Sequence, residues 1–106
     1  MQNLKKETLR KMSSNHTIHD IAWAKIIYMP SLVDEPTDNI LKINHSEDEL
    51  KDFINSLDFN YDDGYGMQEV YGIIMFNDDF WLERVEYDGS ERWALKKRPS
   101  IPQDCR

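Results

Sequence analysis

The stretch from Tyr71 to Pro99 decides the fold, and it reads Y-G-I-I-M-F-N-D-D-F-W-L-E-R-V-E-Y-D-G-S-E-R-W-A-L-K-K-R-P. Three apolar runs are separated by two turn signals, Asn77-Asp78-Asp79 and Asp88-Gly89. Strand-forming runs between such signals are typical of an antiparallel meander. We therefore expect three consecutive antiparallel strands here, with a core supplied by Ile73, Met75, Leu82, Val85 and Leu95.

The Asp88-Gly89 pair also predicts how the last two strands are aligned. A two-residue turn of type I′ places Tyr87 opposite Ser90. Arg84 then lies opposite Trp93, where its guanidinium can stack on the indole ring. The other pairs are Leu82 with Leu95, Glu83 with Ala94, and Glu86 with Glu91. Two glutamates directly opposite each other repel, so a loop of three or four residues, which avoids that pair, remains an alternative.

The clearest helix is expected over residues 46–57. Ser46 and Glu49 fit a capping box, in which each side chain satisfies a free backbone N–H of the first turn. The apolar stripe consists of Leu50, Phe53, Ile54 and Leu57. Its i, i+3, i+4, i+7 spacing places one side of this helix against a core.

A strand is expected over residues 18–29, because Ile26, Ile27 and Tyr28 favour strands and Pro30 ends a ladder. Apolar residues fall on both of its faces, which favours a central strand, although a helix is the alternative. Residues 39–44 add a short extended piece. The order is β-α-β-β-β, and it predicts an α+β fold: a single helix packed on a four-stranded, mainly antiparallel sheet.

A chain of 106 residues is long enough for one domain, and a second would have too little interior. We expect residues 16–102 to form that single α+β domain and residues 103–106 to form a tail. Residues 1–15 are a leader with the apolar residues Leu4, Leu9 and Met12. Their helical spacing is weak, so the leader is either flexible or helical.

The net charge of −7 is unevenly distributed. Residues 13–83 hold three cations against fifteen acids, a net charge of −12, whereas residues 1–12 and 84–106 are mildly basic. An acidic body disfavours direct binding to nucleic acid or to an anionic membrane. It favours a basic partner protein, or serves solubility alone.

The sequence also bears on the compartment. Its apolar runs are far shorter than the roughly 20 residues that span a bilayer, and the N-terminus lacks the apolar run of a secretory signal. A single cysteine, Cys105, excludes a disulfide framework and fits a reducing environment. We therefore expect a cytoplasmic protein without membrane attachment.

Motifs that fix a reaction, such as a nucleophile elbow, a P-loop or C-x-x-C, are absent from the sequence. Glu83 and Glu86 point to opposite faces of a strand and cannot act as an acid–base pair. His16 and His19 lack a third spaced metal ligand, so we interpret them as exposed. Residues 58–64 lack the alternating acids of a calcium loop. We expect no catalysis, no metal and no cofactor.

The acidic helix over residues 46–57 and the Asp-Tyr loop after it form the candidate binding surface. Glycines in this loop, residues 58–69, indicate a turn that exposes its aromatic residues beside acids. Tyrosine among carboxylates suits docking onto the basic groove of a nucleic-acid-binding protein, and a merely solvated face is the alternative. The candidate partner-binding residues are Glu47, Glu49, Asp52, Asp58, Tyr61, Asp62, Asp63 and Tyr65.

The last strand suggests a second kind of partner. Its cations and two tryptophans would make a platform for nucleic acid, formed by Trp81, Arg92, Trp93, Lys96, Lys97 and Arg98. In the alternative interpretation, the lysines protect an edge strand from aggregation. An exposed edge strand would also permit a homodimer.

The segment from Phe80 to Pro102, F-W-L-E-R-V-E-Y-D-G-S-E-R-W-A-L-K-K-R-P-S-I-P, resembles the C-terminal part of small phage- and prophage-borne accessory proteins. The shared pattern is W-x-E-R, then E-Y-D-G-S-E-x-W, then a charged run and P-x-I-P. The resemblance implies a viral setting and action in the host cytoplasm. The resemblance brings no activity with it, but in a viral setting small acidic proteins often inhibit a host nucleic-acid-handling system, such as a CRISPR effector or a restriction enzyme, and by analogy we expect such a role here. A toxin-neutralising immunity protein is a further alternative.

Overall fold

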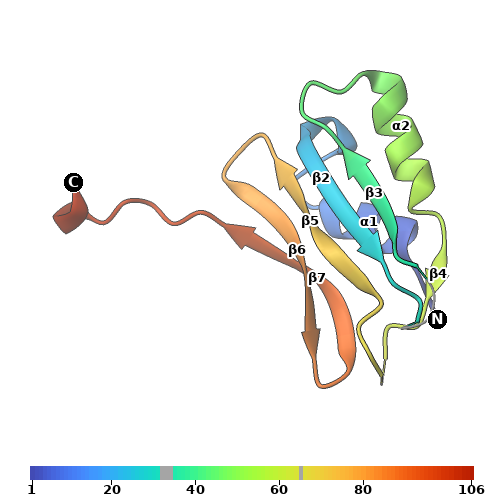
Figure 1. Cartoon of the computed structure of the whole chain (residues 1–106). Coiled ribbons are helices and arrows are strands. Elements are labelled where there is room, and N and C mark those ends of the chain that lie inside the picture. The colour runs from blue at the N-terminus through green and yellow to red at the C-terminus, as the bar shows by residue number, and fades with distance from the viewer. Residues whose placement is uncertain (32–34, 65) are drawn as a thin grey trace.

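The computed structural model describes residues 1–31, 35–64 and 66–106, and it has an α+β fold (Figure 1). A five-stranded sheet in the order β3-β2-β5-β6-β7 forms its centre, and β1 pairs with β4 in a second, two-stranded sheet. The elements are β1 (Gln2–Asn3), α1 (Leu4–Met12), β2 (Ile21–Tyr28), β3 (Thr37–Leu41), α2 (Glu47–Ser56), β4 (Asn60–Tyr61), β5 (Val70–Phe76), β6 (Phe80–Tyr87) and β7 (Ser90–Lys97). Short 3-10 turns, η1 (Ile18–Asp20) and η2 (Gln103–Cys105), complete the set.

This architecture corrects two predicted details. The main sheet has five strands among the described residues, because the extended piece after Pro36 is a full strand, β3, paired antiparallel with β2. The described chain also has two α-helices rather than one, since Leu4–Met12 forms α1. Every strand pair is antiparallel, and β2 is an interior strand between β3 and β5, as predicted, although the helices cover only one of its faces.

The predicted register of the β6–β7 hairpin is confirmed. Tyr87 pairs with Ser90, and Arg84 pairs with Trp93. Asp88 and Gly89 have φ angles of 54° and 82°, the positive values that a type I′ turn requires. The loop therefore remains at two residues.

The repulsion expected between Glu86 and Glu91 is avoided without a longer loop. Glu86 accepts a hydrogen bond from the Gly89 N–H of its own turn, at 2.6 Å. Glu91 instead is 4% exposed and turns toward Arg84 in the core. Each carboxylate therefore has its own donors, which compensate for the proximity of two like charges.

The helix over residues 46–57 is confirmed as α2, and it begins with the predicted capping box. The Ser46 hydroxyl accepts from the Glu49 N–H at 3.1 Å, and the Glu49 carboxylate accepts from the Ser46 N–H at 3.0 Å. The apolar stripe that follows is buried, at 0–5% exposure, and consists of Leu50, Phe53, Ile54 and Leu57.

The N-terminal segment packs into the same core. Asn3 caps α1, and its side-chain oxygen accepts from the Lys6 N–H at 3.0 Å. The buried residues of α1 are Leu4, Thr8 and Met12, whereas Leu9 is 37% exposed. The helix is thus rotated relative to the stripe that apolar residues alone indicate, because Thr8 lies on its buried side.

The two faces of the sheet differ in what covers them. Both helices lie on one side, which we call the helix face (Figure 1). Its strand residues are Ile21, Ala24, Ile26, Val70, Ile74, Phe76, Leu82, Arg84 and Trp93. We call the other side the open face, and it carries Trp23, Lys25, Ile27, Tyr71, Ile73, Met75, Trp81, Glu83, Val85 and Lys96. After β7 the chain leaves the sheet as an exposed arm that projects away from the body (Figure 1).

The predicted core of the meander is correct only in part. Leu82 is fully buried on the helix face. Ile73, Met75 and Val85 lie on the open face with intermediate exposure, and Leu95 is 37% exposed. The sequence prediction combined residues of both faces, since it did not fix which face the helices cover.

Candidate binding surfaces

The acidic residues of α2 are exposed, and they have different roles. Glu47 pairs with His19 at 2.9 Å, and this hydrogen bond lowers the pKa of the Glu47 carboxyl. Glu49 belongs to the helix cap, and the Ser46 backbone N–H lowers the pKa of its carboxyl. Both groups therefore stay ionised to lower pH than free glutamates do.

A groove runs between the outer edge of β3 and one side of α2, with a volume of about 470 Å³. We call it the β3–α2 groove. Its α2 lining has the i, i+3, i+4, i+7 spacing of a single helix side, and its β3 lining is a continuous run of strand. The lining residues are Asp38, Asn39, Ile40, Leu41, Lys42, Glu49, Asp52, Phe53 and Ser56. Glu49 and Asp52 line this groove from α2 together with Lys42, whereas Asp38 is paired with Ile27 of β2 and so directs its side chain to the open face.

The Asp-Tyr loop contributes to a different surface. Asp62 lines a smaller hollow of about 280 Å³ beside Met29, Met67 and Glu69. Its own N–H donates to the Glu69 carboxylate at 2.7 Å. Asp58 accepts from the side-chain amide of Asn3 at 2.9 Å. The residues of the predicted acidic set therefore line different hollows or contact different elements.

Of the two tyrosines of the predicted surface, one is buried and the other is not described. Tyr61 is 1% exposed, so the expectation that this loop presents it to a partner is wrong. It pairs with Gln2 in the small sheet and directs its hydroxyl inward. Tyr65 lies outside the described residues. Asp63 is partly exposed, and its carbonyl accepts from the Glu91 N–H at 3.0 Å.

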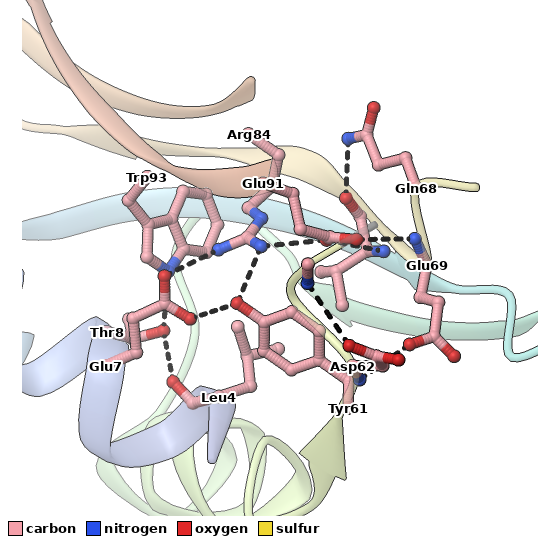
Figure 2. A network of polar contacts seen from close by, with 12 residues as sticks. Leu4, Glu7, Thr8, Tyr61, Asp62, Gln68, Glu69, Arg84, Glu91 and Trp93 are labelled. Carbon is pink, nitrogen blue, oxygen red and sulfur yellow. Dashed lines mark hydrogen bonds and ion pairs between the residues drawn. The ribbon is translucent and has the colours of Figure 1, made fainter. Parts of the chain in front are cut away.

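The inward-facing hydroxyl of Tyr61 belongs to a buried polar network around Arg84 (Figure 2). The Arg84 side chain has no exposed surface, and its two terminal nitrogens contact Glu7 at 3.1 Å and Glu91 at 2.9 Å. It also donates to the Tyr61 hydroxyl at 2.8 Å and lies 5.0 Å from the Trp93 ring centre. The predicted stacking of Arg84 on Trp93 is thus confirmed, in the core rather than at the surface.

Further hydrogen bonds of this network join elements that are distant in sequence. Glu91 accepts from the backbone N–H groups of Glu69 and Val70, at 2.7 Å and 3.0 Å. Trp93 donates its indole N–H to the Thr8 hydroxyl at 2.8 Å, which ties β7 to α1. Among the described residues, the Arg84 Nε has no hydrogen-bond partner. The network joins α1, β4, β6, β7 and the end of the Asp-Tyr loop.

The pKa values of the network follow from its burial and charges. Burial lowers the pKa of Arg84, but the carboxylate of Glu7 and the contacts with Tyr61 raise it more, so the net direction is upward. Burial raises the pKa of Tyr61 strongly, and its hydrogen bond to Glu7 adds to this. The guanidinium is therefore charged and the phenol neutral at neutral pH. We interpret the network as structural.

On the open face, a row of large side chains crosses four strands. Trp23 pairs with Met75, Met75 pairs with Trp81, and Trp81 pairs with Lys96. Trp23 is 36% exposed and Tyr71, on the same face, is 37% exposed. Sequence reasoning missed this row because β2 has an irregularity between Ile21 and Trp23. In a regular strand these two residues would share a face, but here they face opposite sides of the sheet.

The nucleic-acid platform predicted on the last strands does not form as expected. Trp81 lies on the open face, but Trp93 is buried on the helix face, so the two rings cannot act on one ligand. Lys97 lies over the Phe80 ring at 5.4 Å. Of the expected group, Trp81, Arg92 and Lys96 remain on the open face.

One of the two histidines is not exposed as predicted. His16 is 8% exposed, stacks on the Phe76 ring at 3.9 Å and contacts Asp78 at 2.8 Å. His19 is exposed and pairs with Glu47. Within the described part of the chain, there is no group of three or more histidine, cysteine or acidic residues that could hold a metal ion.

Comparison of the chain with protein-family models, with curated proteins and with solved structures finds no significant match. None of the helices in residues 1–31, 35–64 and 66–106 is long and apolar enough to cross a membrane. The case for a function therefore depends on the surfaces described above.

Proposed function

We propose that this chain is a non-enzymatic binding protein that inhibits or modulates a basic, nucleic-acid-handling partner in the host cytoplasm, such as a CRISPR effector or a restriction enzyme. The observation that carries the proposal is the β3–α2 groove, where Glu49 and Asp52 line a hollow beside β3, whose own Asp38 lies on the opposite face of the strand. These three acids exceed the single lysine of the lining, and such an excess of one sign of charge attracts a partner of the opposite sign and speeds its association.

The distribution of charge over the whole chain supports the same partner class. Residues 13–83, which include both sides of the groove, carry a net charge of −12. The resemblance of residues 80–102 to phage- and prophage-borne accessory proteins supplies the host-defence setting. Because the groove lies between a strand edge and a helix, its geometry suits an extended or helical protein segment.

A plating assay tests the proposal. The chain is expressed in bacterial strains that each carry one CRISPR or restriction system, and the plating efficiency of a restricted phage is measured. We expect the wild-type chain to restore plating against at least one system. The groove triple variant Asp38→Asn, Glu49→Gln, Asp52→Asn should lose most of this rescue, since glutamine preserves the capping box while the charge is removed.

The matched control removes three acids outside the groove, with Asp48→Asn, Asp88→Asn and Asp104→Asn. These side chains are exposed, and asparagine is favoured at the first position of a type I′ turn. The control should keep its rescue. Equal loss of rescue in both triple variants would show that net charge, and not the groove, causes the effect. Absence of rescue by the wild-type chain in every strain would contradict the proposal.

A second candidate is binding of single-stranded nucleic acid on the open face. The specific observation is the row of Trp23, Met75 and Trp81 that ends at Lys96, because exposed rings can stack on bases and cations can contact phosphates. Gel-shift assays at low salt with single-stranded DNA and RNA test it. A shift that disappears in Trp23→Ala would support it, and no shift with either strand type would exclude it.

A further inference from the structure

The outer edge of β3 is open to pairing. β3 pairs with β2 through five residue pairs, from Thr37 with Tyr28 to Leu41 with Ala24, and no other strand of the described chain pairs with it. In an antiparallel ladder, alternate residues direct their N–H and C=O groups away from the partner strand. β3 therefore presents a row of backbone donors and acceptors toward the β3–α2 groove.

The two edge strands of the sheet are protected to different degrees. β7 ends in Lys96 and Lys97, the kind of charge that blocks edge-to-edge pairing. β3 instead exposes Ile40, at 53%, and carries one charge, the exposed Asp38. An edge with an exposed apolar residue and no cation favours addition of a basic strand.

The groove also defines which chain fits there. A strand added along β3 would direct alternate side chains to the two faces of the sheet. One set would face the α2 side of the groove, where Glu49 and Asp52 lie, and the other set would lie next to Ile40 and Asp38. This arrangement is complementary to an extended segment in which basic and apolar residues alternate.

We propose that the edge of β3 binds an extended, cationic segment of a partner protein as a sixth strand of the sheet, with its basic side chains against Glu49 and Asp52. The inference rests on the proposed function, because it specifies how the basic partner would be held. Backbone hydrogen bonds to β3 supply the alignment, and the carboxylates supply the preference for lysine and arginine.

The probe for the test is a fluorescent peptide of alternating lysine and valine, long enough to span β3, and binding is measured by fluorescence anisotropy. We expect saturable binding that weakens with salt, and no binding of the matched glutamate–valine peptide. The decisive series carries one N-methyl group at each successive peptide position. Methylation at every second residue should weaken binding by about tenfold or more, and methylation at the residues between should leave it unchanged.

This alternation separates strand addition from docking by side chains alone. Binding that the groove triple variant abolishes, but that shows no alternation, would overturn strand addition and leave the acidic groove as the proposed site. Alternation together with no rescue of plating would support strand addition and contradict the proposed function. Absence of peptide binding would overturn the inference outright.

A second copy of the chain is the competing occupant of this edge. Sedimentation velocity of the full chain, alone and as Ile40→Lys, separates the two cases. We expect the wild-type chain to be monomeric at the concentrations used for the peptide. A wild-type dimer that Ile40→Lys converts to a monomer would show that β3 pairs with another copy, and would overturn the inference.

Discussion

On the helix face of the sheet, Arg84 is 6% exposed, whereas on the open face Trp23 is 36% exposed. A charge is therefore enclosed on the side that packs against α1 and α2, and an indole faces solvent on the other side. The enclosed charge has partners from several elements, namely Glu7, Tyr61 and Glu91. The exposed indole of Trp23 lies in a row with Met75 and Trp81, and neither helix covers that row.

The two faces contribute differently to the structure. A buried ion pair is weak evidence for stability, because desolvation offsets much of its attraction. What the Arg84 network provides is alignment, since its hydrogen bonds are all satisfied together only when α1, β4 and β7 are in place. The open face fixes no helix, so its apolar residues are free to contact another molecule.

The largest expected effect is the loss of the enclosed charge. Arg84→Met should leave two carboxylates, Glu7 and Glu91, in the interior without their cation. We expect the free energy of unfolding to fall by about 3–5 kcal/mol, because an uncompensated buried charge costs this much. Urea denaturation followed by tryptophan fluorescence measures it.

Lys25→Met on the open face is the matched control, since Lys25 is exposed and the same substitution there removes a charge from water. We expect a change within about 0.5 kcal/mol. If the two variants were equally stable, Arg84 would not organise the core, and the contrast between the faces would disappear.

Two neighbouring isoleucines of β5 give a direct test of the faces. Ile74 is fully buried on the helix face, and Ile73 is partly exposed on the open face. Ile74→Ala should cost about 2–5 kcal/mol of unfolding free energy, and Ile73→Ala clearly less, at about 1 kcal/mol. Thermal and urea denaturation of both variants measure the difference.

Equal losses of unfolding free energy at these two positions would show that another molecule covers the open face in solution. Repeating the measurement over a range of protein concentrations shows whether that molecule is a second copy of the chain. A cost at Ile73 that grows with concentration indicates a second copy of the chain, because association stabilises the native state by mass action.

Local signals explain why much of the fold could be predicted. The register of β6 and β7 follows from Asp88-Gly89, because a two-residue turn with positive φ angles leaves one alignment. The start of α2 follows from Ser46 and Glu49, which lie within one helical turn of each other. In both cases, the residues that decide the structure are close in sequence.

The errors arose where the deciding partner is far away in sequence. Thr8 is buried in α1 because its hydroxyl accepts from Trp93 of β7, and no local pattern indicates that bond. Tyr61 is buried with its hydroxyl bonded to Arg84 of β6, a contact between residues distant in sequence that no local pattern indicates. The β3–α2 groove was missed for the same reason, since β3 and the Glu49 side of α2 come together only through the packing of two separate elements.

The bond between Thr8 and Trp93 gives an intermediate effect on the helix face. Thr8→Val keeps the shape but removes the acceptor of the buried indole N–H. We expect a loss of about 1–3 kcal/mol in unfolding free energy, the cost of an unsatisfied buried donor. Thr37→Val, at an exposed position of β3, is the control and should change stability by less than about 0.5 kcal/mol. A neutral Thr8→Val would mean that the indole finds another acceptor.

The smallest expected effect lies on the open face, where Lys96 donates to the Glu83 carboxylate at 3.0 Å. This hydrogen bond, followed by that from Trp81, lowers the pKa of Glu83 below its usual value of 4.5. Because the pair is partly exposed, Lys96→Gln should lower the free energy of unfolding at pH 7 by at most about 0.5 kcal/mol.

The pH dependence of that small difference has a definite sign. A carboxylate whose folded-state pKa is lowered stabilises the protein above its unfolded pKa, and this contribution is lost as the pH falls through the folded value. The difference between wild type and Lys96→Gln should therefore be present at pH 7 and disappear on acidification below the ordinary range of Glu83. Lys97→Gln, whose cation lies over Phe80 instead, should show no such acid-dependent difference. A Lys96 effect that persists unchanged in strong acid would show that its aliphatic stem, packed beside Trp81, matters more than its charge.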